Sequence, residues 1–213
     1  MQTVTTAEMK AIEKQADERG LSFLQMMENA GAAAVHMILE QKPGLRRVTV
    51  CAGRGNNGGD GFVAARLLRE HGCSCAVVLV EGEPKTPDAI TNLQRLREQT
   101  DVPVWQLTDL TMDQVEWIFG CGAIVDAMVG TGFSGELREN TAMMAQLINQ
   151  SLAFVAALDL PTGVNADTGE AAQNAIQADL TIAFHRPKPA HEIAKIYCAQ
   201  TVVADIGIDA VLG

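Results

Sequence analysis

The chain has 213 residues, of which 47% are apolar and 20% charged, enough for one well-buried core in an α/β domain. No linker, repeat or low-complexity tract interrupts residues 1–213, so we expect a single domain. The formal net charge of −10 argues against broad electrostatic binding of nucleic acid or anionic lipid. No apolar run approaches the roughly 20 residues of a membrane span, and residues 1–10 lack the basic-then-apolar order of a signal peptide. Five cysteines without a C-x-x-C pair indicate a reducing compartment, so we expect a cytoplasmic protein that binds neither nucleic acid nor membranes.

Two helices are expected before the first strand. Thr6 is a candidate N-cap for a helix that ends near Gly20, and Ser22 starts a second helix that ends near Gln41. Within these helices Met26, Met27, Ala30 and Ala34 offer an adaptable apolar surface. We expect part of that surface to pair two subunits.

Short apolar runs alternate with helical patterns along the rest of the chain. Seven runs are expected to be strands: 48–52, 75–80, 102–106, 123–126, 154–159, 180–184 and 201–204. Helices are expected after the first strand, from Phe62 to Gly72, and over 88–98, 112–119 and 141–150. This alternation predicts an α/β, Rossmann-like three-layer fold, with a mostly parallel sheet, helices on both faces and two extra N-terminal helices.

The strongest local signal is the segment Gly-Arg-Gly-Asn-Asn-Gly-Gly-Asp-Gly at 53–61, between a buried strand and a helix. Glycines permit positive φ and a close approach of backbone N–H groups, and a helix N-terminus favours an anion. The segment also satisfies G-x-G-x-x-G, and Glu81 follows the next strand as a dinucleotide-binding turn requires. An NAD(P)-dependent oxidoreductase is therefore one open reading, although Asn56, Asn57 and Asp60 are not needed for that turn. A flexible βα turn without a ligand is the structural alternative.

Two later loops also begin with an acid at a strand end. Asp126 precedes the loop 127–136, whose glycines, Thr131 and Ser134 could cradle a second anion. Asp159 precedes Leu-Pro-Thr-Gly at 160–163, which could also be a simple Asx turn. Parallel strands place such loops along one edge, where Asn57, Asp126 and Thr162 offer oxygen ligands for a hard cation. One carboxylate among neutral oxygens favours a monovalent ion.

These motifs together resemble the NAD(P)H-hydrate epimerases, the YjeF N-terminal-like domains, over nearly the whole chain. The resemblance implies interconversion of the R and S epimers of hydrated NADH and NADPH, a bound potassium ion held by Asn57, Asp126 and Thr162, and a homodimer. It implies substrate binding by residues of three loops: Asn56, Asn57, Gly58, Gly59, Asp60, Gly130, Thr131, Gly132, Phe133, Ser134, Gly135, Glu136 and Asp159. A non-catalytic nucleotide-binding scaffold remains an alternative, since similar domains serve in protein interaction.

Within this resemblance Asp159 is the expected catalytic residue, because a carboxylate in a partly dry site can accept and donate a proton in turn. His185 and His191 are candidate helpers, although single histidines in a Pro-rich loop are more often surface residues. The chain departs from the family at Thr162, where Ser is usual, and at Ala190, where Gly usually follows Lys-Pro. A separate or fused ADP/ATP-dependent NAD(P)H-hydrate dehydratase is an expected partner.

Overall fold

The computed structural model describes residues 2–213 and contains one seven-stranded sheet in the order β3-β2-β1-β4-β5-β6-β7. All six strand pairings are parallel, and the seven expected strands are confirmed. The strands are β1 Arg47–Ala52, β2 Ser74–Leu79, β3 Val104–Gln106, β4 Ala123–Ala127, β5 Phe154–Leu158, β6 Leu180–Phe184 and β7 Gln200–Ala204. Because the chain runs from β1 outward to β3 and then returns to β4, β1 and β4 are neighbours at the centre of the sheet.

The expected helices are present, and short ones follow them near the C-terminus. The helices are α1 Thr6–Glu18, α2 Phe23–Gln41, α3 Asn56–Glu70, α4 Pro87–Gln99, α5 Met112–Phe119, α6 Glu139–Gln150, α7 Pro189–Ile193, α8 Lys195–Cys198 and α9 Ile208–Leu212, with a 3₁₀ turn at Leu107–Asp109. The sequence patterns did not predict α7, α8, α9 or the 3₁₀ turn, which are too short to show a period. No helix within residues 2–213 combines the length and apolar character that a membrane crossing requires.

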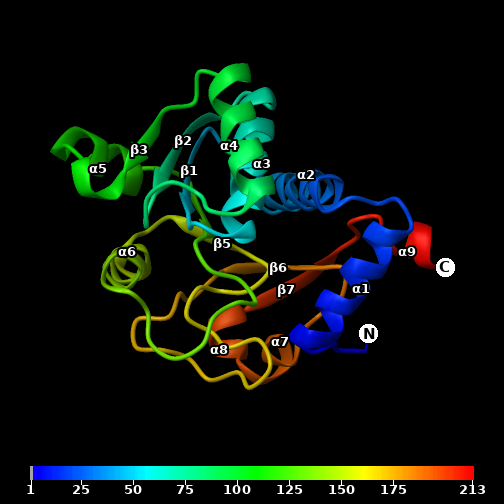
Figure 1. Cartoon of the computed structure of the whole chain (residues 1–213). Coiled ribbons are helices and arrows are strands. Elements are labelled where there is room, and N and C mark those ends of the chain that lie inside the picture. Colours follow the sequence, from blue (N-terminus) through cyan, green and yellow to red (C-terminus); the bar gives the residue numbers. More distant parts are fainter. Residues whose placement is uncertain (1) are drawn as a thin grey trace.

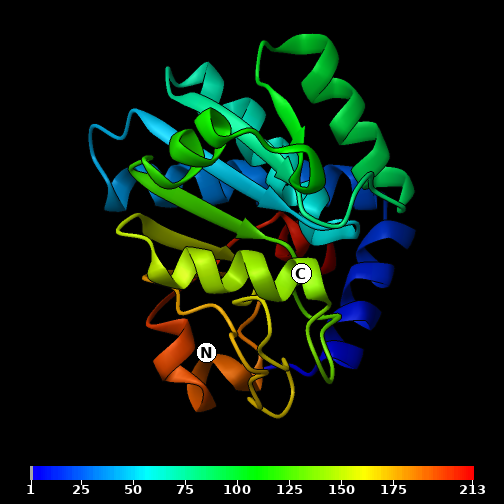
Figure 2. The same cartoon turned by 90° about the vertical axis from the view of Figure 1, so that its left-hand side faces the viewer.

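Helices cover both faces of the sheet, as expected (Figures 1 and 2). Alternate residues of β1 enter different cores: Val48 and Val50 pack with α2, α3 and α4, whereas Cys51 packs with α5 and α6. In Figure 1, α2, α3 and α4 lie on one side of the sheet and α5 and α6 on the other. The connection after β1 therefore leaves on one face and the connection after β4 on the other.

The two N-terminal helices differ from expectation in one cap and in one surface. Thr5, not Thr6, caps α1, because its side chain accepts from the Glu8 N–H while Glu8 binds the Thr5 backbone. The expected dimer surface is wrong. Its members, Met26, Met27, Ala30 and Ala34, are all buried within the subunit, where α2 packs against α3.

The glycine-rich segment serves close packing rather than positive φ. Helix α3 begins at Asn56, six residues earlier than expected, and no glycine of 53–61 has positive φ. A Cβ on Gly53 would lie 1.8 Å from the Met128 carbonyl oxygen, and one on Gly58 would lie 2.1 Å from the Gly53 carbonyl oxygen. Because glycine has no side chain, the turn after β1 can pack directly on the loop after β4.

Gly53→Ala and Gly55→Ala form a matched test of this packing. We expect Gly53→Ala to lower the free energy of unfolding by about 3 kcal/mol or more, because backbone must move to admit the methyl group. Gly55 has φ −98, and no neighbouring atom lies within 4 Å of the position that an added methyl group would take. Gly55→Ala is therefore expected to change the free energy of unfolding by under about 1 kcal/mol. Urea unfolding of both variants measures the difference, and similar losses would contradict this role for Gly53.

Candidate active site

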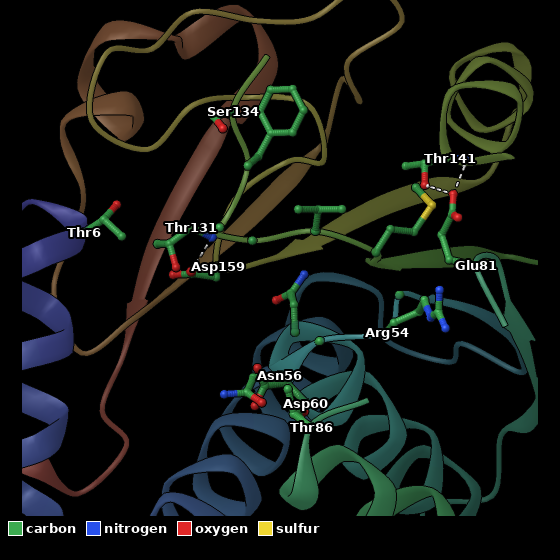
Figure 3. Close-up of a pocket in the computed structure, with 18 of the residues that line it drawn as sticks. Thr6, Arg54, Asn56, Asp60, Glu81, Thr86, Thr131, Ser134, Thr141 and Asp159 are labelled. Atoms are coloured by element: carbon green, nitrogen blue, oxygen red, sulfur yellow. Dashed lines mark hydrogen bonds between the residues drawn. The ribbon is translucent and has the colours of Figure 1, made fainter. Parts of the chain in front are cut away.

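A pocket of about 640 Å³ opens at the carboxyl ends of the central strands, within the range of small-molecule sites. The loops after β1, β2, β4 and β5 surround it, and α1 forms a further wall (Figure 3). Ten of the expected substrate-binding residues line it: Asn56, Asn57, Asp60, Gly130, Thr131, Gly132, Phe133, Ser134, Glu136 and Asp159. Gly58, Gly59 and Gly135 do not; the first two are buried in helix packing, and Gly135 shapes its loop with φ +79. The substrate contacts themselves stay a prediction.

The Asp159 carboxylate is held by a buried lysine. Lys188 Nζ donates to Asp159 Oδ1 at 2.6 Å and to the Phe184 carbonyl at 3.2 Å, and its side chain is 1% exposed. Asp159 Oδ2 accepts from the Thr131 N–H at 3.3 Å, which connects the acid to the loop after β4. An ion pair in such surroundings is oriented by its hydrogen bonds, so the direction of the Asp159 side chain is well defined.

His191 positions the backbone at the same point. The Lys188 N–H donates to His191 Nδ1 at 2.8 Å, so the ring proton lies on Nε2, which donates to the Asp159 carbonyl at 2.7 Å. Burial lowers the pKa of His191, which favours this neutral ring. The expected surface position of His185 and His191 is wrong, since both are buried, and neither lines the pocket.

Asp159 also has a strained backbone. Its φ is +62, and the Leu160 N–H donates across it to the Leu158 carbonyl at 2.8 Å, which is the hydrogen bond of a γ-turn. The same arrangement recurs at the end of β6, where His185 has φ +60 and the Arg186 N–H donates to the Phe184 carbonyl at 2.7 Å. Two neighbouring strands thus end in sharp turns that direct Asp159 and the Lys188 segment toward one another. Strain of this kind is typical of functional sites.

Two further carboxyls, on α3 and α1, share this end of the pocket with Asp159. Burial, followed by the charges of Asp159 and Glu13, raises the pKa of the Asp60 carboxyl well above its usual range. Burial and then the charge of Asp159 raise the pKa of Glu13. Asp60 is therefore favoured in its protonated form beside the ion pair of Asp159 and Lys188. A protonated acid beside a carboxylate can supply a proton donor and an acceptor in one site.

The expected cation ligands lie where the loops after β1, β4 and β5 meet. The fully buried Asp126 accepts from the Thr162 hydroxyl at 2.7 Å and the Thr162 N–H at 2.8 Å, and burial raises the pKa of Asp126 to about 6. The Thr162 hydroxyl also accepts from the Val129 N–H at 2.9 Å. The Asn57 side chain faces Gly130, where a Cβ would lie 3.2 Å from Asn57 Oδ1. Both polar atoms of that amide are buried without a hydrogen-bond partner, which is unusual for a protein interior.

Glu81 has a different role from the one a dehydrogenase would give it. Its Oε1 accepts from the Thr141 hydroxyl at 2.6 Å and the Thr141 N–H at 3.2 Å, so it caps the start of α6 (Figure 3). An acid after the second strand of a dinucleotide-binding fold normally binds a ribose hydroxyl instead. This engagement weakens the oxidoreductase alternative.

Sequence patterns missed Glu13 and the role of Lys188. Glu13 belongs to an amphipathic helix, where an acid is usually solvated, and its place in the pocket depends on how α1 lies across the sheet. Lys188 lies 29 residues after its partner Asp159. A lysine between two prolines, shortly after the turn that ends β6, is the signal that could have indicated it.

Comparisons with known proteins point to one family. Residues 24–190 match the family described as YjeF-related protein N-terminus. The NAD(P)H-hydrate epimerase of Pirellula staleyi is 36% identical over 89% of this chain and 85% of its own length. The bifunctional NAD(P)H-hydrate repair enzyme Nnr of Pyrobaculum aerophilum is 38% identical over 98% of this chain. The crystal structure of the yeast protein ynu0 superposes with a TM-score of 0.82 at 25% identity, covering 95% of this chain and 87% of that one. This chain spans 42% of the length of the Pyrobaculum relative.

The Asp159–Lys188 pair can be tested by a double-mutant cycle. We expect Lys188→Met to lower the free energy of unfolding by about 3 kcal/mol, because Asp159 loses its buried counterion. Combining it with Asp159→Asn is expected to recover about 1 kcal/mol or more of the summed losses. The exposed pair Lys14–Glu18, at 3.7 Å, is the control and should couple by under about 0.5 kcal/mol. Additive losses at Asp159 and Lys188 would contradict the pairing.

Proposed function

Since the chain belongs to the family of YjeF-related N-terminal domains, we propose that it interconverts the R and S epimers of hydrated NADH and NADPH. Relatives named NAD(P)H-hydrate epimerase, each about as long as this chain, support the activity. The structural observation that carries the proposal is the Asp159 carboxylate, oriented by buried Lys188 in a pocket beside Asp60. The proposed epimerase is an isomerase that repairs damaged cofactor.

The reacting carbon bears a hydroxyl and the ring nitrogen, so it is a carbinolamine. In one direction the protonated carboxyl of Asp60 gives its proton to the hydroxyl, the C–O bond breaks, water leaves and the nitrogen lone pair forms a C=N⁺ bond. Water then adds from the opposite face and loses a proton to a carboxylate, which restores the neutral product and the proton count. The Asp159 carboxylate, and the Asp60 carboxylate once its proton has left, stabilise the positive ring in between.

Asp159 is the proposed acceptor in this sequence. Its side chain is 13% exposed, so its contact with solvent is small. Hydrogen bonds from Lys188 and Thr131 fix its orientation. Opening of the ring at the C–N bond is a second route, and it would use the same donor and acceptor. Lys188 and His191 act through Asp159 as positioning residues.

A potassium ion fits the residues that the resemblance implies. Asn57 presents a buried amide oxygen with no partner, and Asp126 supplies one carboxylate beside the neutral Thr162. These oxygen donors, without nitrogen or sulfur, suit a hard monovalent cation. Potassium would link the three loops and offset negative charge of the substrate phosphates; the proton transfers need only Asp60 and Asp159.

Partners follow from the same family. We propose that this epimerase supplies one epimer to an ADP/ATP-dependent NAD(P)H-hydrate dehydratase, because relatives named as bifunctional repair enzymes extend well beyond the matched region. A homodimer stays a prediction, and the surface that would form it is not the one expected on α2.

Asp159→Asn tests the proposed acceptor. We expect the exchange of epimers to fall by about 10²-fold or more, because the amide cannot take the proton, while the affinity for substrate stays within about tenfold. NMR of hydrated NADPH, with the R and S signals followed separately, measures the exchange. Near-normal exchange in a folded variant would remove Asp159 from the reaction.

The adjacent residues Asn57 and Asn56 test the ion. We expect Asn57→Ala to raise the potassium concentration needed for half-maximal exchange by about tenfold, the effect of about 1.4 kcal/mol of lost binding. Asn56 is exposed, and Asn56→Ala should leave that concentration unchanged. Sodium should substitute poorly because it is smaller. Exchange independent of potassium, together with no anomalous signal near Asn57 in crystals grown in potassium salt, would show that the ion site is wrong.

A further inference from the structure

Three cationic side chains line the pocket on the side of Glu81, away from Asp159. They come from three different loops: Arg54, Lys85 and Arg138. In Figure 3 Arg54 lies beside Glu81 at one end, whereas Asp159 and Thr131 lie toward α1. The chain has ten more acidic than basic residues, so such a cluster is not a consequence of overall composition.

Hydrogen bonds tie these three loops together. The Lys85 N–H donates to the Arg54 carbonyl at 2.8 Å, and Arg54 Nε donates to the Glu83 carbonyl at 3.4 Å. Thr141 of α6 binds Glu81 through both its hydroxyl and its N–H, and Arg138 is the residue directly before that helix. Arg54, Lys85 and Arg138 therefore lie on three loops that hydrogen bonds connect, and we call these loops the rim of the pocket.

Two acids beside these cations, Glu81 and Glu83, already have partners. Glu81 is engaged by Thr141, and the Glu83 carboxylate binds Arg97 at 2.7 and 3.2 Å. Glu136 also lines the pocket, but within residues 2–213 no carboxylate lies within 4.0 Å of the charged groups of Arg54, Lys85 or Arg138. The three positive charges are free to bind an anion that enters the pocket.

We propose that Arg54, Lys85 and Arg138 form a subsite for the adenosine 2′-phosphate, so that the chain acts on hydrated NADPH in preference to hydrated NADH. This inference rests on the proposed epimerase function. Dinucleotide-binding folds read NAD through an acid on the ribose 2′-hydroxyl and NADP through a nearby arginine. Here the acid, Glu81, is held by Thr141, and the arginine, Arg54, faces the pocket.

The arrangement of the pocket also orients the rest of the substrate. The nicotinamide ring belongs at the Asp159 end, because the reacting carbon needs the proton donor and acceptor there. The glycine-rich loops around Asn57 and Gly130 also line the pocket and suit the pyrophosphate. The remaining phosphate of NADPH then reaches the rim of cations.

The test compares the two hydrates as substrates. We expect Arg54→Gln and Arg138→Gln each to lower the ratio of kcat/KM for hydrated NADPH to that for hydrated NADH by about tenfold, the range of one charge-assisted contact. Lys195→Gln removes a charge from exposed α8, outside the pocket, and should leave the ratio unchanged. An unchanged ratio in the two arginine variants, with equal losses or no loss on both hydrates, overturns the subsite.

A binding measurement separates this inference from the proposed function. By calorimetry, wild type should bind adenosine 2′,5′-bisphosphate about tenfold more tightly than adenosine 5′-phosphate, and Arg54→Gln should remove that difference. If neither hydrate is epimerised but this difference is found, the proposed function fails and the subsite stands. Equal affinities of wild type for the two nucleotides overturn the subsite whatever the activity.

Discussion

The reversal of chain direction at β1 is the constraint on which the site depends. From β1 the sheet grows first toward β3 and then, after a return across β1, from β4 toward β7. The connection after β1 enters α3 on one face, and the connection after β4 leads to α6 on the other. Loops that diverge in this way leave a crevice at the carboxyl ends of the strands. The glycine turn, the loop of Gly130 and the Asp159 turn all border that crevice because of this strand order.

Within this crevice, Asp60 and Asp159 lie at the inner end, and the cations Arg54, Lys85 and Arg138 lie at the outer end. The buried Lys188 compensates one acid of the inner end, and burial, followed by the charges of nearby acids, raises the pKa of the Asp60 carboxyl. The outer end carries cations, and the neighbouring acids Glu81 and Glu83 bind Thr141 and Arg97 instead. In a molecule whose ring becomes positive and whose phosphates stay negative, the ring suits the inner end and a phosphate suits the outer end. Such a molecule therefore has one favourable orientation in the pocket.

Much of the fold and part of the site could be predicted from periodicity and from acids at strand ends. Asp126 and Asp159 were placed correctly because parallel strands end at a common edge. The expected start of α3 was wrong, since glycine suggests a turn, whereas Gly58, Gly59 and Gly61 belong to the helix and serve its close packing. Glu13 was missed because its role depends on how a separate helix lies against the sheet. The buried surface of α2 was mistaken for an interface because periodicity does not say what an apolar face packs against.

The contact between Gly53 and the Met128 carbonyl has a consequence for how such a site can diverge. At this contact the inner surface of the crevice is backbone resting on backbone, and no side chain can be inserted at Gly53 without moving the backbone of the loops after β1 and β4. The rim consists of side chains on loops, which tolerate replacement far better. Descendants of such a gene could therefore explore new ligands by exchanging rim residues while inheriting the inner geometry unchanged. Neutral drift at the rim would broaden or narrow the range of ligands long before it altered the chemistry.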